Sequence, residues 1–565
     1  MRRGLGRAAV LIGAITVLAR IAGFGRTLVF AHTVGNTHLG TAYATANQVP
    51  NIIFDIVAGG ALTAVVVPVL AGPAQRAGRD PAAAADTSRT ASALLTWAIV
   101  VLVPLSVALA LVAGPVATAL LGPGGSANAE IVAVATQMLV VFAPQIVLYG
   151  LAVVLYGILQ ANHRFTAPAL APLLSSLVVS AAYVAFLPLG DGYQNLRHGL
   201  PRAAELMLSV GTTAGVAALA LTVAVPAWRI GLNLRPTLRF PHGVAVRVRG
   251  LAAAGIATVA AQDLALVAVI VLANSRGGTG ALVLYNYGWQ MFFLPYAVLA
   301  VSVATTAFPL LSAHAAPTGT GELVVADAAG TGEVVPAGAT RSNPADGRFN
   351  AVAAASTRAA VLASFLGAAA LAGAAAPAAR VFVTHQAASA RELTLAFVAF
   401  SPGLVGYGLV ANLSRVLLAS GRSTSAAVTT VTGWLVVMAA DLAIVPFVPR
   451  SWVVPALGLG NTIGLTVAGA ALLAAVKRAH GAACLAGLPR ALIAGLAAAV
   501  AGGAAGAAVA AAGTRAFGLG GALPAAGMAI VAGLVTLAVF LAVGYLADSG
   551  DLRAATARVL RRRTG

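Results

Sequence analysis

Apolar stretches long enough to cross a bilayer recur along the whole of this chain. A spanning helix needs about 20 consecutive, mostly apolar residues. The mean hydropathy is +0.93 and only 9% of the residues are charged, against roughly 25% in soluble domains. We therefore predict an all-α polytopic membrane protein with about fourteen spans, near residues 8–32, 41–71, 90–121, 129–161, 168–188, 203–227, 248–274, 280–312, 351–379, 393–419, 424–448, 453–476, 488–512 and 521–547.

One element of the chain occurs twice. Residues 142–164 and 400–422 align without a gap at an offset of 258 and match at 10 of 23 positions, including F-x-P-x4-Y-G-L followed by L-x-A-x-x-R. In membrane proteins such duplication places a substrate route between two related halves, which rock to expose it alternately to each side. The repeat therefore predicts a transporter.

Positive charge predicts the topology, because cytoplasmic loops retain Lys and Arg. Of the 34 Lys and Arg residues, 23 fall on one side of the predicted spans and 7 on the other. The remaining four lie in or near spans: Arg20, Arg26, Arg358 and Arg415. Both termini are therefore predicted to be cytoplasmic. Because the net charge of +19 follows this topology, no nucleic-acid partner is expected.

The spans are predicted to form three parts. Residues 1–230 would be an N-terminal lobe of six spans, residues 231–480 a second lobe of six, and residues 481–565 two further spans with a basic tail. A segment rich in Gly, Thr and Pro, residues 316–348, is predicted to be a mobile cytoplasmic loop.

Enzyme motifs are absent from the sequence. It contains no P-loop, no metal-spaced His or Cys cluster and no G-x-S-x-G elbow, and its single cysteine, Cys484, cannot form an intrachain disulfide. We expect no enzymatic activity and no bound cofactor. Transport would draw on a Na+ or H+ gradient, the membrane potential or the substrate gradient.

Two arginines, Arg20 and Arg26, lie six residues apart in the first predicted span. An ionised side chain near the bilayer centre costs at least about 2.5 kcal/mol, so each needs a wet cavity or a partner. On a helix they lie about 9 Å apart along the axis and about 120° around it, so both can border one broad cavity. Between them, Gly23 and Gly25 leave room for a bulky ligand or a closely packed helix. A guanidinium suits phosphate oxygens, so we predict diphosphate binding. The alternative is that Arg26 snorkels or pairs with Asp55.

Acidic residues also occur within the spans. Asp263 and Asp441 are the most isolated of them, and oxygen ligands of this kind suit hard cations. A coupling-ion or proton site at these two residues is one interpretation. The other is that each is a buried, hydrogen-bonded carboxylate or pairs with Arg415. Three prolines are expected to break or kink their helices and free carbonyls that line a cavity: Pro50, Pro295 and Pro402.

Seven motifs stand in order along the predicted spans. They are L-A-R-I-A-G-F-G-R at 18–26, V-P-N at 49–51, G-G-A-L-T-A-V-V-V-P-V-L at 59–70, G-I-L-Q-A-N-H-R-F at 157–165, P-A-L-A-P at 168–172, L-P-Y-A-V at 294–298 and F-P-L-L-S at 308–312. Together they resemble the MurJ/MviN family. The resemblance covers nearly all the spans and weakens after about residue 480.

The resemblance implies a flippase of the multidrug/oligosaccharidyl-lipid/polysaccharide exporter superfamily. Such a protein moves the peptidoglycan precursor lipid II to the outer leaflet of the bacterial cytoplasmic membrane by alternating access. The implied fold has two pseudo-symmetric six-helix lobes around a central cationic cavity, and two extra C-terminal helices that form a groove for the lipid tail. Arg20 and Arg26 match the family's two first-helix arginines, which are implicated in binding the diphosphate and sugar head.

Several cavity charges of the family are missing from this chain. An arginine is replaced by Phe54 in the second span and by Gln290 in the eighth, and an acid is replaced by Thr41 and by Gly59. Neutral residues on the same spans offer hydrogen bonds instead, and of these we assign Asn51 and Gln290 to the predicted substrate site. Either the chain binds the same diphosphate with fewer cations, or its cargo differs.

Three functions are compatible with these residues. The first is translocation of lipid II, the second is export of another polyprenyl-linked glycan, and the third is a non-transporting membrane scaffold for cell-wall synthesis. The expected partners are lipid II or a related polyprenyl-diphosphate glycolipid, membrane lipids, and proteins of cell-wall synthesis and division.

Overall fold

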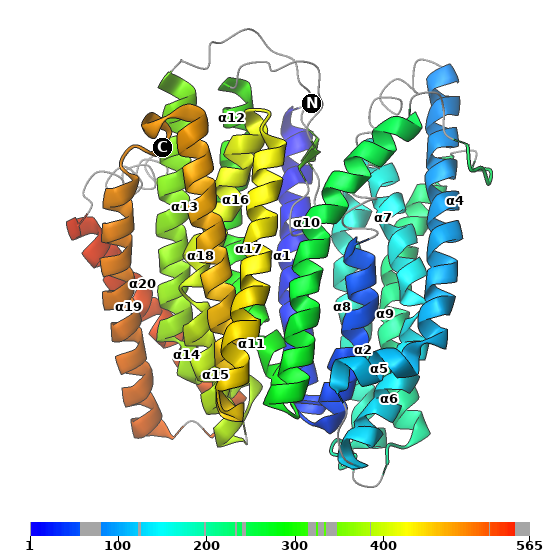
Figure 1. Ribbon diagram of the computed structural model, residues 1–565, viewed down its shortest axis with the longest axis horizontal. Coiled ribbons are helices and arrows are strands. Elements are labelled where there is room, and N and C mark those ends of the chain that lie inside the picture. Colours follow the sequence, from blue (N-terminus) through cyan, green and yellow to red (C-terminus); the bar gives the residue numbers. More distant parts are fainter. Residues whose placement is uncertain are drawn as a thin grey trace. The chain divides into compact units, whose positions relative to one another are not determined.

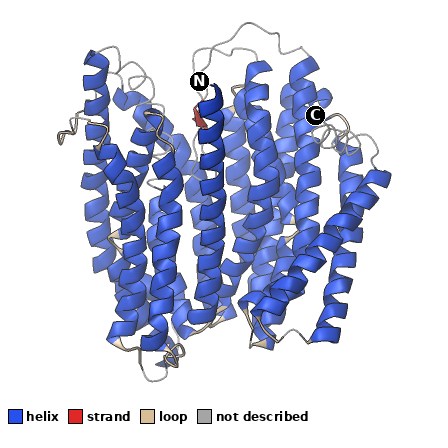
Figure 2. Cartoon of the chain, turned by 180° about the vertical axis from the view of Figure 1, so that it is seen from behind, coloured by secondary structure: helices blue, strands red, loops and turns tan. Residues whose placement is uncertain are grey.

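The computed structural model describes residues 2–56, 81–122, 126–196, 199–231, 234–239, 244–314, 324–325, 333–334, 347–384, 386–518 and 520–547. The chain forms two compact units (Figure 1). Unit 1 comprises Met1–Val283 and Val324–Val334, and unit 2 comprises Leu284–Leu323 and Val335–Gly565. Apart from one short strand pair, the regular structure of both is helical (Figure 2). The predicted all-α membrane fold is confirmed.

Unit 1 is a bundle of long apolar helices. A bilayer offers the backbone no hydrogen-bond partner, so each span satisfies its own backbone groups as a helix. The elements are α1 (Arg2–Thr33), α2 (His38–Phe54), α4 (Pro81–Leu111), α5 (Ala113–Leu121), α6 (Ser126–Phe142), α7 (Gln145–Ala161), α8 (Thr166–Gly190), α9 (Arg202–Trp228), α10 (Val244–Leu272) and the π-helical turn η2 (Ala273–Gly277). In this bundle α8 packs against α1 and α9, α7 against α4 and α9, and α2 against α6.

Unit 2 is a second helical bundle. Its elements are α11 (Ala281–Pro295), which begins just before the unit boundary, η3 (Tyr296–Ala300), α12 (Val301–His314), α13 (Gly347–Gly373), α14 (Ala375–Phe382), α15 (Ala387–Phe400), α16 (Gly403–Ala419), α17 (Ser423–Ile444), η4 (Val445–Phe447), η5 (Arg450–Trp452), α18 (Val453–His480), η6 (Ala482–Leu485), α19 (Leu488–Phe517) and α20 (Ala522–Ala547). Here α18 packs against α16 and α17, and α19 against α13 and α20. The described residues of the predicted loop 316–348 include β1 (Val324–Val325) and β2 (Glu333–Val334), which pair antiparallel and belong to unit 1.

The packing units do not coincide with the predicted lobes. Unit 1 includes α10, the first helix of the predicted second lobe, and α19 and α20 belong to unit 2 instead of standing apart. The units follow packing, whereas the predicted lobes follow the order of the spans. The boundaries at residues 230 and 480 therefore stay a prediction.

Twelve helices in the described part of the chain are long and apolar enough to cross a membrane, and the bent pair of α15 and α16 adds a thirteenth. The predicted span 41–71 extends beyond the described residues, and its described part is α2. The motif at residues 59–70 also lies outside them. The count of fourteen therefore stays a prediction.

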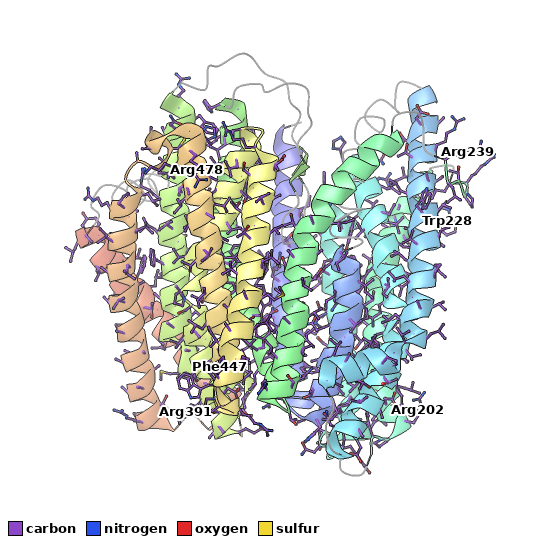
Figure 3. The ribbon with its side chains drawn as sticks, viewed as in Figure 1. Arg202, Trp228, Arg239, Arg391, Phe447 and Arg478 are labelled. Carbon is purple, nitrogen blue, oxygen red and sulfur yellow. The ribbon has the colours of Figure 1, made fainter. Side chains whose placement is uncertain are left out.

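Charged ends of the helices agree with the predicted alternation of sides within each unit. Arg202 and Arg239 mark opposite ends of unit 1, and Arg391 and Arg478 mark opposite ends of unit 2 (Figure 3). The predicted topology separates the same pairs. Which end is cytoplasmic stays a prediction from the Lys and Arg bias.

The duplicated element has the same local structure in both copies. Each copy begins at the last residue of one helix, α6 or α15, and includes the whole of the next helix, α7 or α16. A proline, Pro144 or Pro402, lies at the break between the two helices. Both second helices are 17 residues long. The break predicted at Pro402 is thus confirmed, with a bend of 43°.

The second helix of each copy also ends in the same way. The amide of Arg164 donates to the carbonyl five residues earlier at 2.8 Å, and Arg422 does so at 2.8 Å. The residue before each arginine has a positive φ, 57° at His163 and 74° at Gly421, as this helix cap requires. The sequence repeat is therefore also a structural repeat.

The other two prolines behave differently. Pro295 ends α11, where the π-helical turn η3 begins, so the predicted irregularity is present there. Pro50 lies inside α2, which continues to Phe54. The helix is therefore not broken at Pro50, because a helix in protein surroundings can continue past a proline when the carbonyl that it frees is accommodated nearby. A kink at Pro50, the other outcome expected, stays a prediction.

Glycines allow α16 and α18 to approach closely. A Cβ atom added at Gly406 would overlap the carbonyl oxygen of Leu465 and lie 2.7 Å from the amide nitrogen of Thr466. One added at Gly469 would lie 3.1 Å from the carbonyl oxygen of Gly406. Small residues have this role where lipid provides no hydrophobic drive for helix association.

We expect Gly406→Ala to lower the stability of the purified protein by about 1–3 kcal/mol, because the added methyl group would force two helix backbones apart. The measurement is the midpoint of thermal unfolding in detergent. Gly533→Ala on α20 is the matched control, since its added Cβ would meet no described atom within 4 Å. Equal midpoints for the two variants would contradict the close approach of α16 and α18.

Candidate functional site

Arg26 is a half-buried cation in the candidate span Leu11–Thr33 of α1. It lies within electrostatic range of Tyr43 on α2 and Tyr149 on α7. Among the described residues it forms no ion pair, so the predicted alternative of a pair with Asp55 is not observed. A guanidinium in a span needs a counter-charge or water. Arg26 is therefore placed to receive an anion.

The two glycines near Arg26 have different surroundings. A Cβ added at Gly25 would meet no described atom within 4 Å, whereas one at Gly23 would lie 4.0 Å from the hydroxyl of Ser176 on α8. Gly25 thus leaves open space beside Arg26, and Gly23 faces the neighbouring helix. Arg20, six residues before Arg26 on α1, is exposed.

Tyr43 is held in place by a polar network in the core of unit 1. Its hydroxyl shares hydrogen bonds with the hydroxyl of Tyr183 at 2.7 Å and with that of Thr212 at 2.8 Å. Its ring centroid lies 5.2 Å from that of Phe30 and 5.7 Å from that of Phe142. Our reading of the sequence missed Tyr183 and Thr212, because no motif or charge distinguishes them from other core residues.

The end of α2 contributes the other polar groups near Arg26. Asn51 and Asp55, four residues apart, are both half-buried, and the amide of Asp55 donates to the carbonyl of Asn51. Phe54 packs against Tyr149 with ring centroids 4.6 Å apart. Tyr149 lies within electrostatic range of both Arg26 and Asp55. An aromatic pair therefore lies beside Arg26 and Asp55.

Asp263, on α10 of unit 1, is 1% exposed, and its Oδ2 atom has no hydrogen-bond partner among the described residues. It lies within electrostatic range of Asp55. The alternative of a hydrogen-bonded carboxylate is therefore not observed for this oxygen among the described residues, and it stays a prediction.

Asp441, on α17 of unit 2, is fully buried, and neither of its carboxylate oxygens has a partner in the described structure. The predicted alternative of a pair with Arg415 is therefore wrong. Asn461 on α18 is also buried, and its amide makes no hydrogen bond of ordinary geometry with a described residue. Tyr285 lies beside Asp441 and close to the Asn461 amide. Gly460 makes room for the carboxylate, since a Cβ there would overlap its Oδ1.

Unpartnered buried oxygens are costly unless they bind a proton, a cation or water. Asp441 and Asn461 together offer carboxylate and amide oxygens to such a species. Asn461 was not predicted, because an asparagine in an apolar span has no distinguishing spacing.

The other residues of the predicted substrate and ion sites are divided between the two units. Gln290 lies on α11 in unit 2, is half-buried and follows Trp289, whose ring packs 5.3 Å from that of Phe292. Arg26 belongs to unit 1, so a joint site of Arg26 and Gln290 stays a prediction. The same holds for Asp263 and Asp441, which belong to different units.

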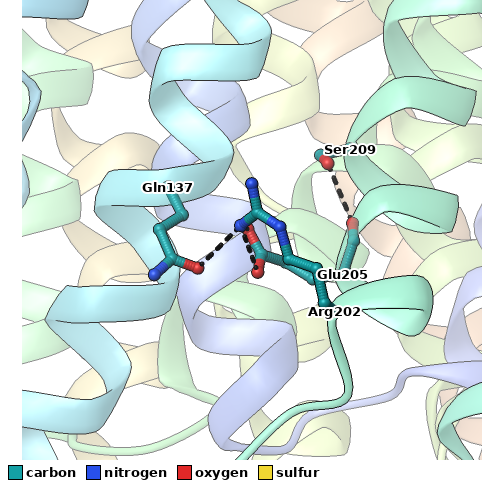
Figure 4. A network of polar contacts seen from close by, with 4 residues as sticks. All are labelled: Gln137, Arg202, Glu205 and Ser209. Carbon is teal, nitrogen blue, oxygen red and sulfur yellow. Dashed lines mark hydrogen bonds and ion pairs between the residues drawn. The ribbon is translucent and has the colours of Figure 1, made fainter.

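Glu205 provides a contrasting carboxylate, because its partners are present (Figure 4). Arg202 donates to its two oxygens at 3.1 and 3.3 Å. The amide of Gln137 on α6, when turned so that its nitrogen faces Glu205, donates to them at 2.6 and 3.0 Å. This orientation of the Gln137 amide is favoured because an ionised carboxylate only accepts hydrogen bonds and therefore needs the nitrogen, not the oxygen, to face it. Glu205 thus ties α9 to α6 and has no open coordination comparable with that of Asp441.

The chain is similar to known proteins in both sequence and fold. The model of a family described as lipid II flippase MurJ matches residues 30–523. A lipid II flippase MurJ of Burkholderia cenocepacia is 27% identical over 316 residues, which are 54% of this chain and 57% of that protein. The chain thus matches little more than half the length of this curated relative.

Two solved structures share the fold. A lipid II flippase MurJ in an inward closed conformation superposes with a TM-score of 0.69 at 16% identity, covering 95% of this chain and 98% of that one. An inward-facing multidrug resistance MATE family transporter superposes with a TM-score of 0.64 at 14% identity, covering 84% and 98%. At these identities the likeness concerns the fold alone.

Proposed function

Because the chain belongs to the lipid II flippase MurJ family, we propose that it moves lipid II from the inner to the outer leaflet of the bacterial cytoplasmic membrane. One observation carries the proposal: Arg26 is a half-buried cation in a span, and no described acid pairs with it. A diphosphate would supply the missing counter-charge. Open space at Gly25 would accept the bulk of the headgroup.

The residues have distinct proposed roles. Arg26 and Arg20 bind the diphosphate, and Asn51 and Gln290 donate hydrogen bonds to the headgroup. Alternating access of the two related halves then exposes the headgroup on the other side while the lipid tail stays in the bilayer. The partners are lipid II and the surrounding membrane lipids, with proteins of cell-wall synthesis and division as further candidates.

Asp441 and Asp263 are proposed as separate sites for energy coupling. Asp441 with Asn461 would hold Na+ through carboxylate and amide oxygens, or Asp441 would carry a proton. A gradient of either ion, or the membrane potential, would then drive the conformational cycle.

We expect the purified protein to bind lipid II about tenfold more tightly than an undecaprenyl monophosphate-linked sugar, because the second phosphate adds charge-assisted hydrogen bonds to guanidinium. The measurement is a binding titration in detergent with both lipids. Equal affinity would count against the assignment of Arg20 and Arg26 to the diphosphate.

A second candidate function is export of another polyprenyl-linked glycan. The aromatic pair of Phe54 and Tyr149, in place of a further cation, favours it. An aromatic face suits a sugar ring, whereas a cation suits a phosphate. Tighter binding of the monophosphate-linked sugar in the same titration would support this candidate over lipid II.

A further inference from the structure

The connection from α9 to α10 exposes an alternating set of apolar and cationic side chains. α9 ends at Trp228, which is 84% exposed (Figure 3). In residues 234–239, Leu234 and Leu238 are 42% and 51% exposed, and each precedes an exposed arginine, Arg235 or Arg239. Exposed large apolar side chains next to cations are typical of segments at a membrane surface.

This segment is fixed along α4. The backbone amide of Arg235 donates to the hydroxyl of Ser92 at 3.0 Å, and that of Thr237 donates to the hydroxyl of Thr96 at 3.1 Å. In return, the indole of Trp97 donates to the carbonyl of Leu238 at 3.1 Å. We name residues 234–239 the α4 strap. Its side chains are thus presented at a defined level of the bundle.

That level corresponds to the edge of the bilayer. The candidate span of α4, Ala85–Leu111, has 27 residues and is about 40 Å long, whereas the hydrocarbon core is about 30 Å thick. The excess of about 10 Å corresponds to about seven residues, so with the excess at this end Ser92 lies at the boundary and Trp97 lies about 8 Å below it. Tryptophans such as Trp97 and Trp228 are enriched at this depth.

The charge near the strap is positive and largely uncompensated. The chain has no Asp or Glu between Glu205 and Asp263, and Arg229, like the two strap arginines, is exposed. At the nearby end of α4, the exposed acid Asp86 is balanced by the exposed Arg89. Guanidinium groups beside apolar side chains complement a phosphate that carries acyl chains, and a soluble polyanion would leave the apolar side chains exposed.

We propose that the α4 strap, with Trp97 and Trp228, binds an anionic phospholipid of the leaflet on that side of the membrane. The headgroup phosphate lies between Arg235 and Arg239, and the acyl chains lie along Leu234, Leu238 and Trp228. The site lies on the outer surface of α4. It does not depend on the identity of the transported lipid.

The test uses the full-length protein in phosphatidylcholine nanodiscs that contain brominated phosphatidylglycerol or brominated phosphatidylcholine at equal mole fraction. Bromine quenches nearby tryptophans, and the difference between the wild type and Trp228→Phe isolates the signal of Trp228. We expect the anionic lipid to quench Trp228 about threefold more than the zwitterionic lipid. Salt at about 0.5 M should reduce this preference, because it screens the attraction between charges.

Charge removal tests the assignment to the strap. Replacing Arg229, Arg235 and Arg239 together by glutamine should make quenching by the two lipids equal. The matched control removes three exposed arginines of unit 2, Arg391, Arg450 and Arg515, and should keep the preference. Equal quenching in the wild type, or a preference that survives the strap substitutions, would overturn the proposal. If the substituted protein fails to fold, a wild-type preference unaffected by salt would also overturn it.

Discussion

Replacing Arg26 by alanine is expected to slow transport of lipid II by about 10- to 100-fold, because charge-assisted hydrogen bonds contribute about 1.5–3 kcal/mol each. Arg26 has no described carboxylate that would compensate for a lost ligand contact or be left unpaired by the substitution. The loss should therefore appear in function and not in stability. The measurement is the rate of lipid II transfer in proteoliposomes at matched protein content.

Arg26→Lys and Arg391→Ala serve as controls for this result. Lysine keeps the charge but lacks the planar donor fork, so an intermediate rate is expected. Arg391 is exposed on α15 of unit 2, outside the proposed site, and its removal should leave the rate unchanged. Full transport by Arg26→Ala would refute the role of Arg26. If Arg20→Ala and Arg26→Ala both left cell-wall synthesis intact in cells, a non-transporting scaffold would be the better interpretation.

Asp441→Asn is expected to abolish the response of transport to an imposed ion gradient. The carboxylate is fully buried and has no hydrogen-bond partner among the described residues, so it is suited to bind and release a cation or proton during the cycle. Moving one charge through 100 mV provides about 2.3 kcal/mol, which corresponds to about a fifty-fold change in an equilibrium. Transport by the variant should stay at the rate found without a gradient. Proteoliposomes with separate Na+, H+ and voltage gradients provide the measurement.

Two further substitutions locate the coupling group. Asp263→Asn tests the buried acid of unit 1 in the same assay, and Asp86→Asn, at an exposed position on α4, is the control. The fold should tolerate Asp441→Asn, because the substitution removes a buried carboxylate for which the described structure provides no partner. If Asp441→Asn keeps its response to every gradient and Asp263→Asn loses it, the coupling group is Asp263. If both keep it, neither acid couples transport.

Much of the fold could be predicted because its signals are local. A run of about 20 apolar residues specifies a span by itself, and the repeat at residues 142–164 and 400–422 predicted two copies that the structure shows with the same proline break and the same helix cap. The break at Pro402 could be predicted for the same reason, since a proline acts on its own turn. Pro50 shows the limit, because the course of α2 depends on what surrounds the carbonyl that the proline frees.

The candidate site was predicted only in part. Arg26, Asp263 and Asp441 could be found because a charge in a span is rare and costly wherever the helix packs. The residues that surround these three charges in the fold could not be predicted. Nothing in the residue order shows that Arg26 would lie near Tyr43 and not pair with Asp55, or that Asn461 would share a buried polar region with Asp441.

The sequence by itself determined that this chain is a membrane-embedded helical protein with an internal repeat and a few charges that the bilayer makes expensive. Those properties depend on hydropathy and on neighbours within one or two helical turns. The tertiary structure alone decided which charges are compensated, where Glu205 finds its partners while Asp441 does not, and how the α4 strap comes to lie on a helix about 140 residues earlier. The physical reason is that helix faces distant in sequence meet only through the packing of the whole bundle, which local periodicity does not specify.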